Sequence, residues 1–340
     1  MVTIYDIAKK ANVSPMTVSR VINNSPSIKE STRLKVEEAI RELEYVPNKQ
    51  ARSLTSKETK LVSLVIPDIS NPFFTNIARG AEDKALQLGY QVILGNTDEN
   101  KDKEAMYINM LMSSGVDGAL IVPSSDDSAA NMKRLVKRRI PFVYVDRTVD
   151  SVPADSITGD NLNTTRELVQ HLIELGHERI GLINGPAYLS NARERAQAFR
   201  DTLILSGIQP NPRYMIETHF KQDNLDEIIS KFLSLRENER PTAIVAANNF
   251  IGVNTLRALR SLGIRVPEDI SVTCFDDPDI IPDYNPFLTV AKQPAYDMGY
   301  IGMQLLIERI QNEAPAATRK IVLPAELKVR TSTSRRGAQD

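Results

Sequence analysis

The chain has 340 residues and a formal net charge of −1, because 42 Lys and Arg residues nearly balance 43 Asp and Glu residues. This length exceeds what one hydrophobic core usually supports and predicts two or three domains. The single cysteine, Cys274, excludes an internal disulfide, and the sequence has neither a membrane-length apolar run nor an N-terminal signal segment. We therefore expect a cytoplasmic protein with no membrane partner.

The charge is unevenly distributed along the chain. Residues 1–60 contain 11 Lys and Arg against 7 Asp and Glu, whereas the rest of the chain contains 31 against 36. A small basic head on a larger acidic body suggests that a polyanion binds the head alone.

Residues 3–23 predict two short amphipathic helices separated by a tight turn. Apolar residues recur at helical spacing from Ile4 to Ala11, and again from Val18 to Ile22. The second helix has outward side chains that are small, polar or basic, as a helix requires to enter a DNA major groove. These side chains are Pro15, Met16, Thr17, Ser19, Arg20 and Asn23. The alternative is a plain three-helix bundle with a polar outer face.

A third helix is expected at Lys29–Leu43, and a short segment at residues 48–56 follows it. This segment favours helix but is only about two turns long and has no adequate apolar face, so it is marginal alone in water. We expect it to form when it pairs with its copy in a dimer on DNA. Leu54 would then be an apolar wedge in the minor groove, and Arg52 would approach phosphates. The alternative is a flexible linker.

The strings TIYDIAKKANVSPMTVSRVIN and LEYVPNKQARSLTSKET resemble the head and hinge of the LacI/GalR family of bacterial transcription regulators. The resemblance implies a recognition helix that carries Ser14, Pro15, Met16, Thr17, Ser19 and Arg20, with Leu54 as the intercalating leucine. We add Tyr5 and Asn23 to the expected DNA-binding residues. Pro15 and Met16 stand where relatives often have small polar residues, which implies a distinct base preference.

From Leu61 onward, buried strand patterns alternate with helical ones in two successive series. This alternation predicts doubly wound parallel α/β sheets in two lobes, with ligand bound beyond the carboxyl ends of the strands. Residues 61–330 resemble the periplasmic sugar-binding proteins, in which the chain crosses between lobes three times. We expect a head at 1–47, a hinge at 48–60 and a body at 61–335. The N-lobe would comprise 61–161 and 290–322, and the C-lobe 162–289 and 323–335.

Residues that follow the strands should line the cleft between the lobes. Two or three aromatic faces with amide, carboxylate and guanidinium groups suit a small ring that carries many hydroxyls. By motif, these positions match the sugar contacts of bacterial ribose-binding protein, except Ser125, where that protein has an aspartate. The expected effector-binding residues are Asn71, Phe73, Phe74, Ser125, Arg147, Phe220, Asn248, Asp276 and Gln293.

An enzyme is not expected. The sequence has neither a G-x-G-x-x-G nor a P-loop motif, and its three histidines are too scattered to suggest a metal site. We therefore predict no catalytic residue, no metal and no cofactor.

The resemblance implies a homodimeric repressor that binds a pseudo-palindromic double-stranded DNA operator. Within the family, the segments PDISNPFF, LGNTDEN and KQPAYDMG look most like those of ribose-operon repressors of Gram-positive bacteria. We expect a monosaccharide, with ribose favoured, to lower operator affinity. One alternative is a catabolite-control regulator whose operator affinity rises with a phosphocarrier protein or a phosphorylated sugar. Another is a sugar-binding module without regulatory DNA binding.

Overall fold

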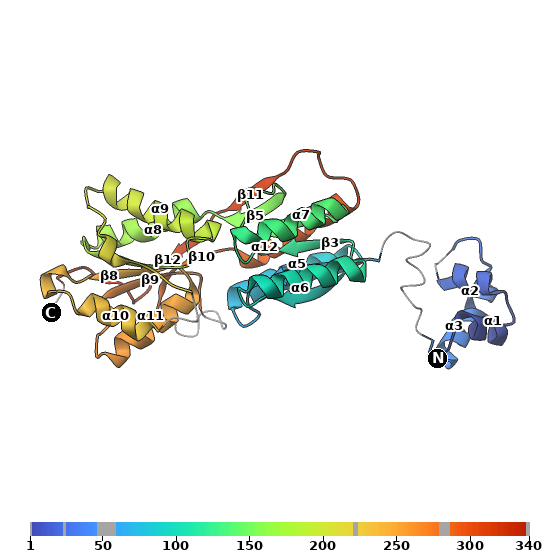
Figure 1. Cartoon of the computed structure of the whole chain (residues 1–340). Coiled ribbons are helices and arrows are strands. Elements are labelled where there is room, and N and C mark those ends of the chain that lie inside the picture. The colour runs from blue at the N-terminus through green and yellow to red at the C-terminus, as the bar shows by residue number, and fades with distance from the viewer. Residues whose placement is uncertain (1, 23–24, 46–58, 220–223, 279–285, 338–340) are drawn as a thin grey trace. The chain divides into compact units, whose positions relative to one another are not determined.

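The computed structural model describes residues 2–22, 25–45, 59–219, 224–278 and 286–337 (Figure 1). The chain forms two compact units, Met1–Thr59 and Lys60–Asp340. Four residues predicted to bind DNA or effector lie outside the described ranges: Asn23, Arg52, Leu54 and Phe220. Most of the hinge predicted at 48–60 lies outside them as well. Among the described residues, no helix is long and apolar enough to cross a lipid bilayer.

The first unit contains three helices: α1 (Ile4–Ala11), α2 (Pro15–Ile22) and α3 (Glu30–Glu42). Asp6 caps α1 by accepting hydrogen bonds from the Thr3 backbone N–H at 2.8 Å and from its hydroxyl at 2.7 Å. Asn12 ends α1 at φ 52°, a left-handed conformation that asparagine tolerates, and so makes the tight turn into α2. Ser14 caps α2 by accepting a hydrogen bond from the backbone N–H of Thr17. The small core joins all three helices: Ile7, Ala8, Ala11, Val18, Val21, Val36 and Ala39.

The first sheet of the second unit has the order β11-β5-β4-β3-β1-β2, and all its strands are parallel. The strands are β1 (Leu61–Ile66), β2 (Gln91–Asn96), β3 (Gly118–Ile121), β4 (Phe142–Val145), β5 (Asp155–Gly159) and β11 (Lys320–Leu323). One hydrophobic core lies under α5 (Pro72–Gln87) and α12 (Ala295–Ile310). A second lies under α6 (Lys101–Ser114) and α7 (Ala129–Arg138). The central strands are buried on both faces, which explains their unbroken apolar sequence.

The second sheet repeats this arrangement with the order β12-β10-β9-β8-β6-β7. Its strands are β6 (Ile180–Asn184), β7 (Met215–Glu217), β8 (Ala243–Ala246), β9 (Ser271–Phe275), β10 (Thr289–Lys292) and β12 (Glu326–Lys328), and β12 is antiparallel to β10. Helices α8 (Asn161–Glu174) and α9 (Ser190–Leu205) cover one face. Helices α10 (Leu225–Leu233) and α11 (Asn249–Ser261) cover the other. Short 3₁₀ turns lie at Asp126–Ser128, Pro212–Tyr214 and Glu237–Glu239.

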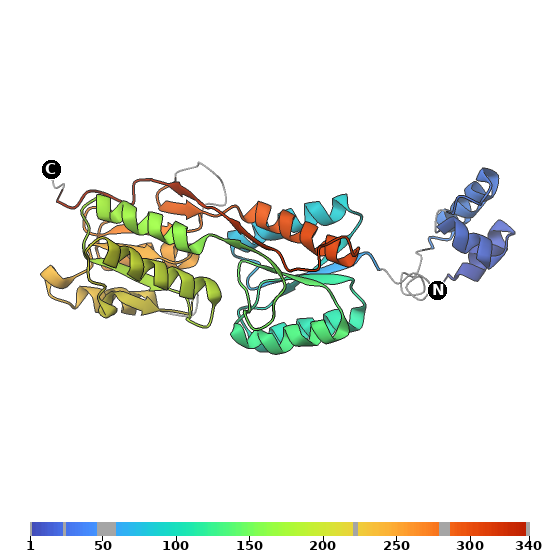
Figure 2. The same cartoon turned by 90° about the horizontal axis from the view of Figure 1, so that it is seen from above.

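The chain passes between the two lobes three times: between β5 and α8, between β10 and α12, and between β11 and β12. Figure 2 shows the last of these, the C-terminal segment, running from one lobe to the other. Strand β10 belongs to the second sheet through Lys292, so the second passage lies at 293–294, a few residues after the expected position near 290. Parallel strands in both sheets end where these passages begin, which places their carboxyl ends around the space between the lobes.

Helices α5 and α12 approach so closely that glycine is needed where they touch. A Cβ atom added at Gly299 would lie 1.9 Å from the Ile77 carbonyl oxygen, which is backbone and cannot move aside cheaply. We expect Gly299→Ala to lower the free energy of unfolding by about 1–3 kcal/mol, although alanine's helix propensity alone would add about 1 kcal/mol. Urea-induced unfolding measures this change. In the matched control Gly181→Ala, the new Cβ would have an ordinary contact at 3.4 Å. Equal unfolding midpoints for Gly299→Ala and Gly181→Ala would contradict the prediction.

Candidate functional site

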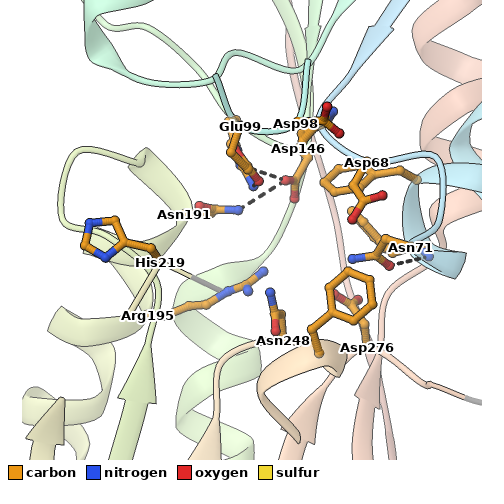
Figure 3. A pocket seen from close by; sticks show the side chains of 15 residues that line it. Asp68, Asn71, Asp98, Glu99, Asp146, Asn191, Arg195, His219, Asn248 and Asp276 are labelled. Carbon is orange, nitrogen blue, oxygen red and sulfur yellow. Dashed lines mark hydrogen bonds and ion pairs between the residues drawn. The ribbon is translucent and has the colours of Figure 1, made fainter. Parts of the chain in front are cut away.

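A cavity of about 250 Å³ lies between the lobes, at the carboxyl ends of strands from both sheets. Figure 3 shows Asp68, Asp98, Glu99 and Asp146 entering it from one lobe, and Asn191, Arg195 and Asn248 from the other. Six of the residues predicted to bind an effector line the cavity: Asn71, Phe73, Phe74, Arg147, Asn248 and Asp276. The prediction that residues directly after the strands line the cleft therefore identified residues from both lobes that the fold brings together.

Two residues of the predicted set, Ser125 and Gln293, do not line this cavity. The buried Gln293 side chain instead donates a hydrogen bond from Nε2 to Oδ1 of Asp276 at 2.8 Å. It thus orients a carboxylate that does line the cavity. Ser125 precedes the 3₁₀ turn Asp126–Ser128, and its enclosed Oγ has no hydrogen-bond partner among the described residues.

Nine lining residues were not in the predicted set: Pro67, Asp68, Asp98, Glu99, Asp146, Asn191, Arg195, His219 and Phe250. Asp98 and Glu99 follow β2, a strand whose end contributed no residue to the predicted set. If the residues directly after β2 had been included in the prediction, both would have been identified. Asn191 and Arg195 lie on α9 beyond the strand end, so the positions of the strand ends do not identify them.

Asp146 and Asp276 occupy equivalent positions, directly after β4 in one lobe and after β9 in the other. Both residues have a left-handed backbone conformation, with φ 64° and 62°, which Asp adopts more readily than most residues. Each backbone N–H donates to a carbonyl of the neighbouring strand, Ile157 or Ala291, at 3.0 Å. This shared geometry turns both carboxylates toward the space between the lobes.

Burial raises the pKa of both carboxylates, because a charge is poorly solvated inside the protein. For Asp276 burial is the largest cause and raises the pKa to about 7, although Arg195 and the Gln293 hydrogen bond oppose it. Burial likewise raises the pKa of Asp146, against the opposing charges of Arg147 and Arg195. Asp276 therefore changes charge near neutral pH unless hydrogen-bond donors stabilise its ionised form.

Arg147 is buried and holds two carboxylates of its own lobe. Its Nη1 and Nη2 donate to the two carboxylate oxygens of Glu99 at 2.7 and 2.8 Å. Its Nε lies 3.3 Å from Oδ2 of Asp146. Burial alone would lower the pKa of Arg147, but the charge and hydrogen bonds of Glu99 raise it above the ordinary value. The guanidinium thus stays charged, with its charge balanced inside the protein.

Arg195 enters the cavity from α9 with most of its guanidinium engaged. Its Nε donates to Oδ1 of Asn161 at 2.8 Å, and its Nη1 donates to the Ala247 carbonyl oxygen. The group lies over the Phe275 ring, 4.0 Å from the ring centroid. Among the described residues, Nη2 has no hydrogen-bond partner and remains available to a ligand.

Aromatic side chains form one wall of the cavity. Phe73 and Phe74 pack edge to face, with ring centroids 5.2 Å apart, and the Arg147 guanidinium carbon lies 5.9 Å from the Phe74 centroid. Asn71 precedes these rings and caps α5 by accepting a hydrogen bond from the Phe73 N–H at 2.9 Å. The cap and the following proline fix the direction in which this helix starts.

Direct hydrogen bonds join the lobes around the cavity. The side-chain amides of Asn71 and Asn249 exchange two hydrogen bonds, at 2.8 and 3.2 Å. Asn191 donates to Oδ2 of Asp146 at 3.1 Å, and Arg193 pairs with Asp126 at 2.7 Å on the surface. A ligand in the cavity would add to contacts that already hold the lobes together.

The outward face of α2 carries the residues predicted to read DNA. Met16 is 64% exposed and Tyr5 on α1 is 71% exposed, which is unusual for such large side chains. Arg20 and Ser14 are exposed as well, whereas Pro15, Thr17 and Ser19 are half-buried. Val18 and Val21, on the opposite face of α2, are buried. The first unit thus presents a helix whose free face can enter a groove.

Comparisons with known proteins agree with both units. Residues 3–48 match the family model for bacterial regulatory proteins of the lacI family, and residues 169–333 match the periplasmic binding protein-like domain. The chain is 36% identical to the HTH-type transcriptional regulator DegA of Bacillus subtilis over 98% of each chain. It is 35% identical to catabolite control protein A of Priestia megaterium, over 98% of this chain and 99% of that protein. It is 34% identical to the ribose operon repressor of Halalkalibacterium halodurans, over 98% of this chain and 97% of that protein.

Among solved structures, the Lac repressor dimer bound to operator and the anti-inducer ONPF superimposes with a TM-score of 0.83. It shares 30% identity and covers 98% of this chain and 99% of its own. A helix-turn-helix head joined to a two-lobed body defines a DNA-binding transcriptional regulator with an effector-binding domain, and not an enzyme. The chain belongs to the lacI family of bacterial regulatory proteins. Identities of 34–36% to regulators with different names do not single out a ribose repressor.

Proposed function

We propose that this protein is a homodimeric repressor that releases its operator when an uncharged monosaccharide binds between the lobes. Ribose is the favoured sugar. The observation that carries the proposal is the cavity itself, which takes hydrogen-bonding groups from both sheets and an aromatic wall from one. Its volume of about 250 Å³ lies just below the ~300–1,000 Å³ of sites for drug-sized ligands, so a single sugar ring suits it better than two.

The side chains that line the cavity suit hydroxyl groups. The carboxylates of Asp146 and Asp276 accept hydrogen bonds from hydroxyls, while Nη2 of Arg195 and the Asn248 side-chain amide donate to them. Oδ1 of Asn248 is used by the N–H of Ile251 at 2.8 Å, which leaves its amide N–H groups for a ligand. Phe73 and Phe74 would cover the C–H face of the ring. We propose these six residues as the sugar-binding set.

Sugar binding lowers operator affinity if the sugar binds two arrangements of the lobes with unequal affinity. A sugar that contacts Asp146 and Asp276 together stabilises one spacing of the lobes, and the head is connected to the first lobe through the hinge predicted at 48–60. We propose that the hinge segments pair on a pseudo-palindromic operator in the uninduced state, with Leu54 in the minor groove. We expect the protein in the cytoplasm, because a bacterial DNA-binding regulator acts on the chromosome.

The test is operator affinity at fixed salt, measured by fluorescence anisotropy with and without D-ribose. We expect ribose to weaken operator binding by about 5–150-fold, the range that 1–3 kcal/mol of coupling gives, and L-ribose to have no effect. Fixed salt matters because phosphate contacts make affinity strongly salt-dependent. Unchanged affinity with D-ribose and with a panel of other monosaccharides would overturn the proposal.

The second candidate is a catabolite-control regulator, because the chain is 35% identical to catabolite control protein A. In that case a phosphocarrier protein or a phosphorylated sugar would raise operator affinity in the same assay. Sugar binding without any operator binding would instead indicate a sugar-binding module.

A further inference from the structure

Acidic side chains outnumber basic ones around the cavity. Five of the lining side chains are carboxylates, Asp68, Asp98, Glu99, Asp146 and Asp276, and two are guanidinium groups. Like charges at short range repel more strongly where water is largely excluded. An anionic ligand therefore needs a guanidinium whose charge is not already balanced.

Arg147 does not meet that need, and Arg195 offers an anion only one nitrogen, Nη2. Arg147 is 4% exposed and forms a two-pronged ion pair with Glu99, at 2.7 and 2.8 Å, besides its contact with Asp146. Its Nη1 also donates to the Pro123 carbonyl oxygen at 3.3 Å. Arg195 is held by Asn161 and Ala247, so one nitrogen is left to the cavity. A phosphate could bind Arg147 only by displacing Glu99.

The loop that carries Glu99 is built to hold it in place. Asp98 and Glu99 are both left-handed, at φ 52° and 56°, and two such consecutive non-glycine residues are strained. The backbone N–H of Asp98 donates to the Pro67 carbonyl oxygen at 2.7 Å. The Asn96 amide donates to Oδ1 of Asp98 at 2.6 Å. These contacts stabilise the loop and direct the Glu99 side chain toward Arg147.

We propose that Glu99 is a specificity-determining residue that closes the site to anionic sugars by occupying Arg147. The inference rests on the proposed function for the identity of the ligand class, but it concerns the charge that the cavity accepts. Glu99 lets the site keep a rigid guanidinium beside Phe74 without a net positive charge. Without the negative charge of Glu99, Arg147 keeps its Nε contact with Asp146, but the two nitrogens that Glu99 held can pair with an anion from solution.

The experiment compares full-length wild type, Glu99→Gln and Glu99→Asp by calorimetric titration with D-ribose and ribose 5-phosphate at fixed salt. We expect wild type to bind ribose about 100-fold more tightly than the phosphate. In Glu99→Gln the phosphate should gain about tenfold or more, because a charge-assisted pair with Arg147 becomes available. Glu99→Asp keeps the negative charge while shortening the side chain, so its affinity for the phosphate should stay low.

The matched control is Glu313→Gln, which removes one exposed carboxylate outside the cavity and should change neither affinity. Melting temperature and operator binding confirm that each variant is folded. Three outcomes would each overturn the inference: wild type binding both ligands equally, no gain in Glu99→Gln, or equal gains in Glu99→Gln and Glu99→Asp. If Glu99→Gln does not fold, equal binding of both ligands by wild type would still overturn the inference.

Failure of the proposed function looks different. If wild type binds neither ribose nor any other uncharged monosaccharide, the proposal that the cavity binds such a sugar is wrong. A gain of phosphate affinity in Glu99→Gln would still support the selectivity role of Glu99 in that case.

Discussion

Asp276→Asn is expected to abolish most of the effector response while leaving operator binding unchanged. The carboxylate of Asp276 lies in the cavity, and the head that binds DNA is a separate compact unit. Hydrogen bonds to a charged group contribute ~1.5–3 kcal/mol each, so losing one or two should weaken sugar binding by about 10–150-fold or more. Asparagine keeps Oδ1, which can still accept the hydrogen bond from Gln293. Calorimetric titration with the effector, together with operator anisotropy, measures both effects.

The same prediction fixes the pH dependence of sugar binding. Burial raises the pKa of Asp276 from 3.8 to about 7, so the unliganded folded protein retains this proton between those values. That proton stabilises the folded state at low pH, and its contribution to stability is lost as pH rises through about 7. Sugar hydroxyls donate to the ionised carboxylate and offset that loss. Effector affinity should therefore rise about tenfold between pH 6 and pH 8 in wild type. Asp276→Asn should remove the part of this rise that Asp276 causes and leave any part due to Asp146, whose pKa burial also raises.

The control is Asp127→Asn, which neutralises a carboxylate on the surface, 78% exposed, beside Lys101. It should keep both the effector response and the pH profile of wild type. If Asp276→Asn titrates with the sugar as wild type does, the carboxylate makes no contact with the ligand, and the assignment of the cavity as the effector site is wrong.

The architecture could be predicted because local patterns and global fold agree. The stripe from Ile7 to Val21 is compatible only with helices that pack on one another, and the apolar runs at β3, β6 and β9 are typical of strands buried on both faces. The short strands around the passages between lobes, such as β10 and β12, carry no such signal. They have four and three residues, and they are identified by their pairing partners, which local sequence does not contain.

The site was predicted less completely, for a physical reason. Strand-end residues such as Asn248 and Asp276 could be placed because the topology determines where they lie. The partners of those residues could not be placed in this way. Arg147 was expected to contact sugar, yet the structure shows it paired with Glu99 across 48 residues of sequence. Gln293 was expected in the cavity, yet it orients Asp276 from outside. Such pairings depend on distances between side chains that are remote in sequence.

Arg20→Ala is expected to weaken operator binding by about 5–150-fold, since one base or phosphate contact by arginine contributes roughly 1–3 kcal/mol. Arg20 is exposed on α2, the helix whose opposite face packs into the core through Val18 and Val21. Its removal should therefore leave the fold of the head intact, with a change of stability within about 0.5 kcal/mol. Anisotropy on operator and on scrambled DNA, at several salt concentrations, measures the decrease in affinity.

The salt series also shows which part of the DNA Arg20 binds. If Arg20 binds a phosphate, Arg20→Ala should lower the slope of log K against log salt by about one and weaken binding to both DNAs equally. If Arg20 binds a base, the slope should stay the same and only binding to operator should weaken. Lys35→Ala, which removes an equal charge from α3, controls for net charge and should weaken operator binding much less. Equal decreases in Arg20→Ala and Lys35→Ala would mean that the head attracts DNA by charge alone. The assignment of α2 as the recognition helix would then be wrong.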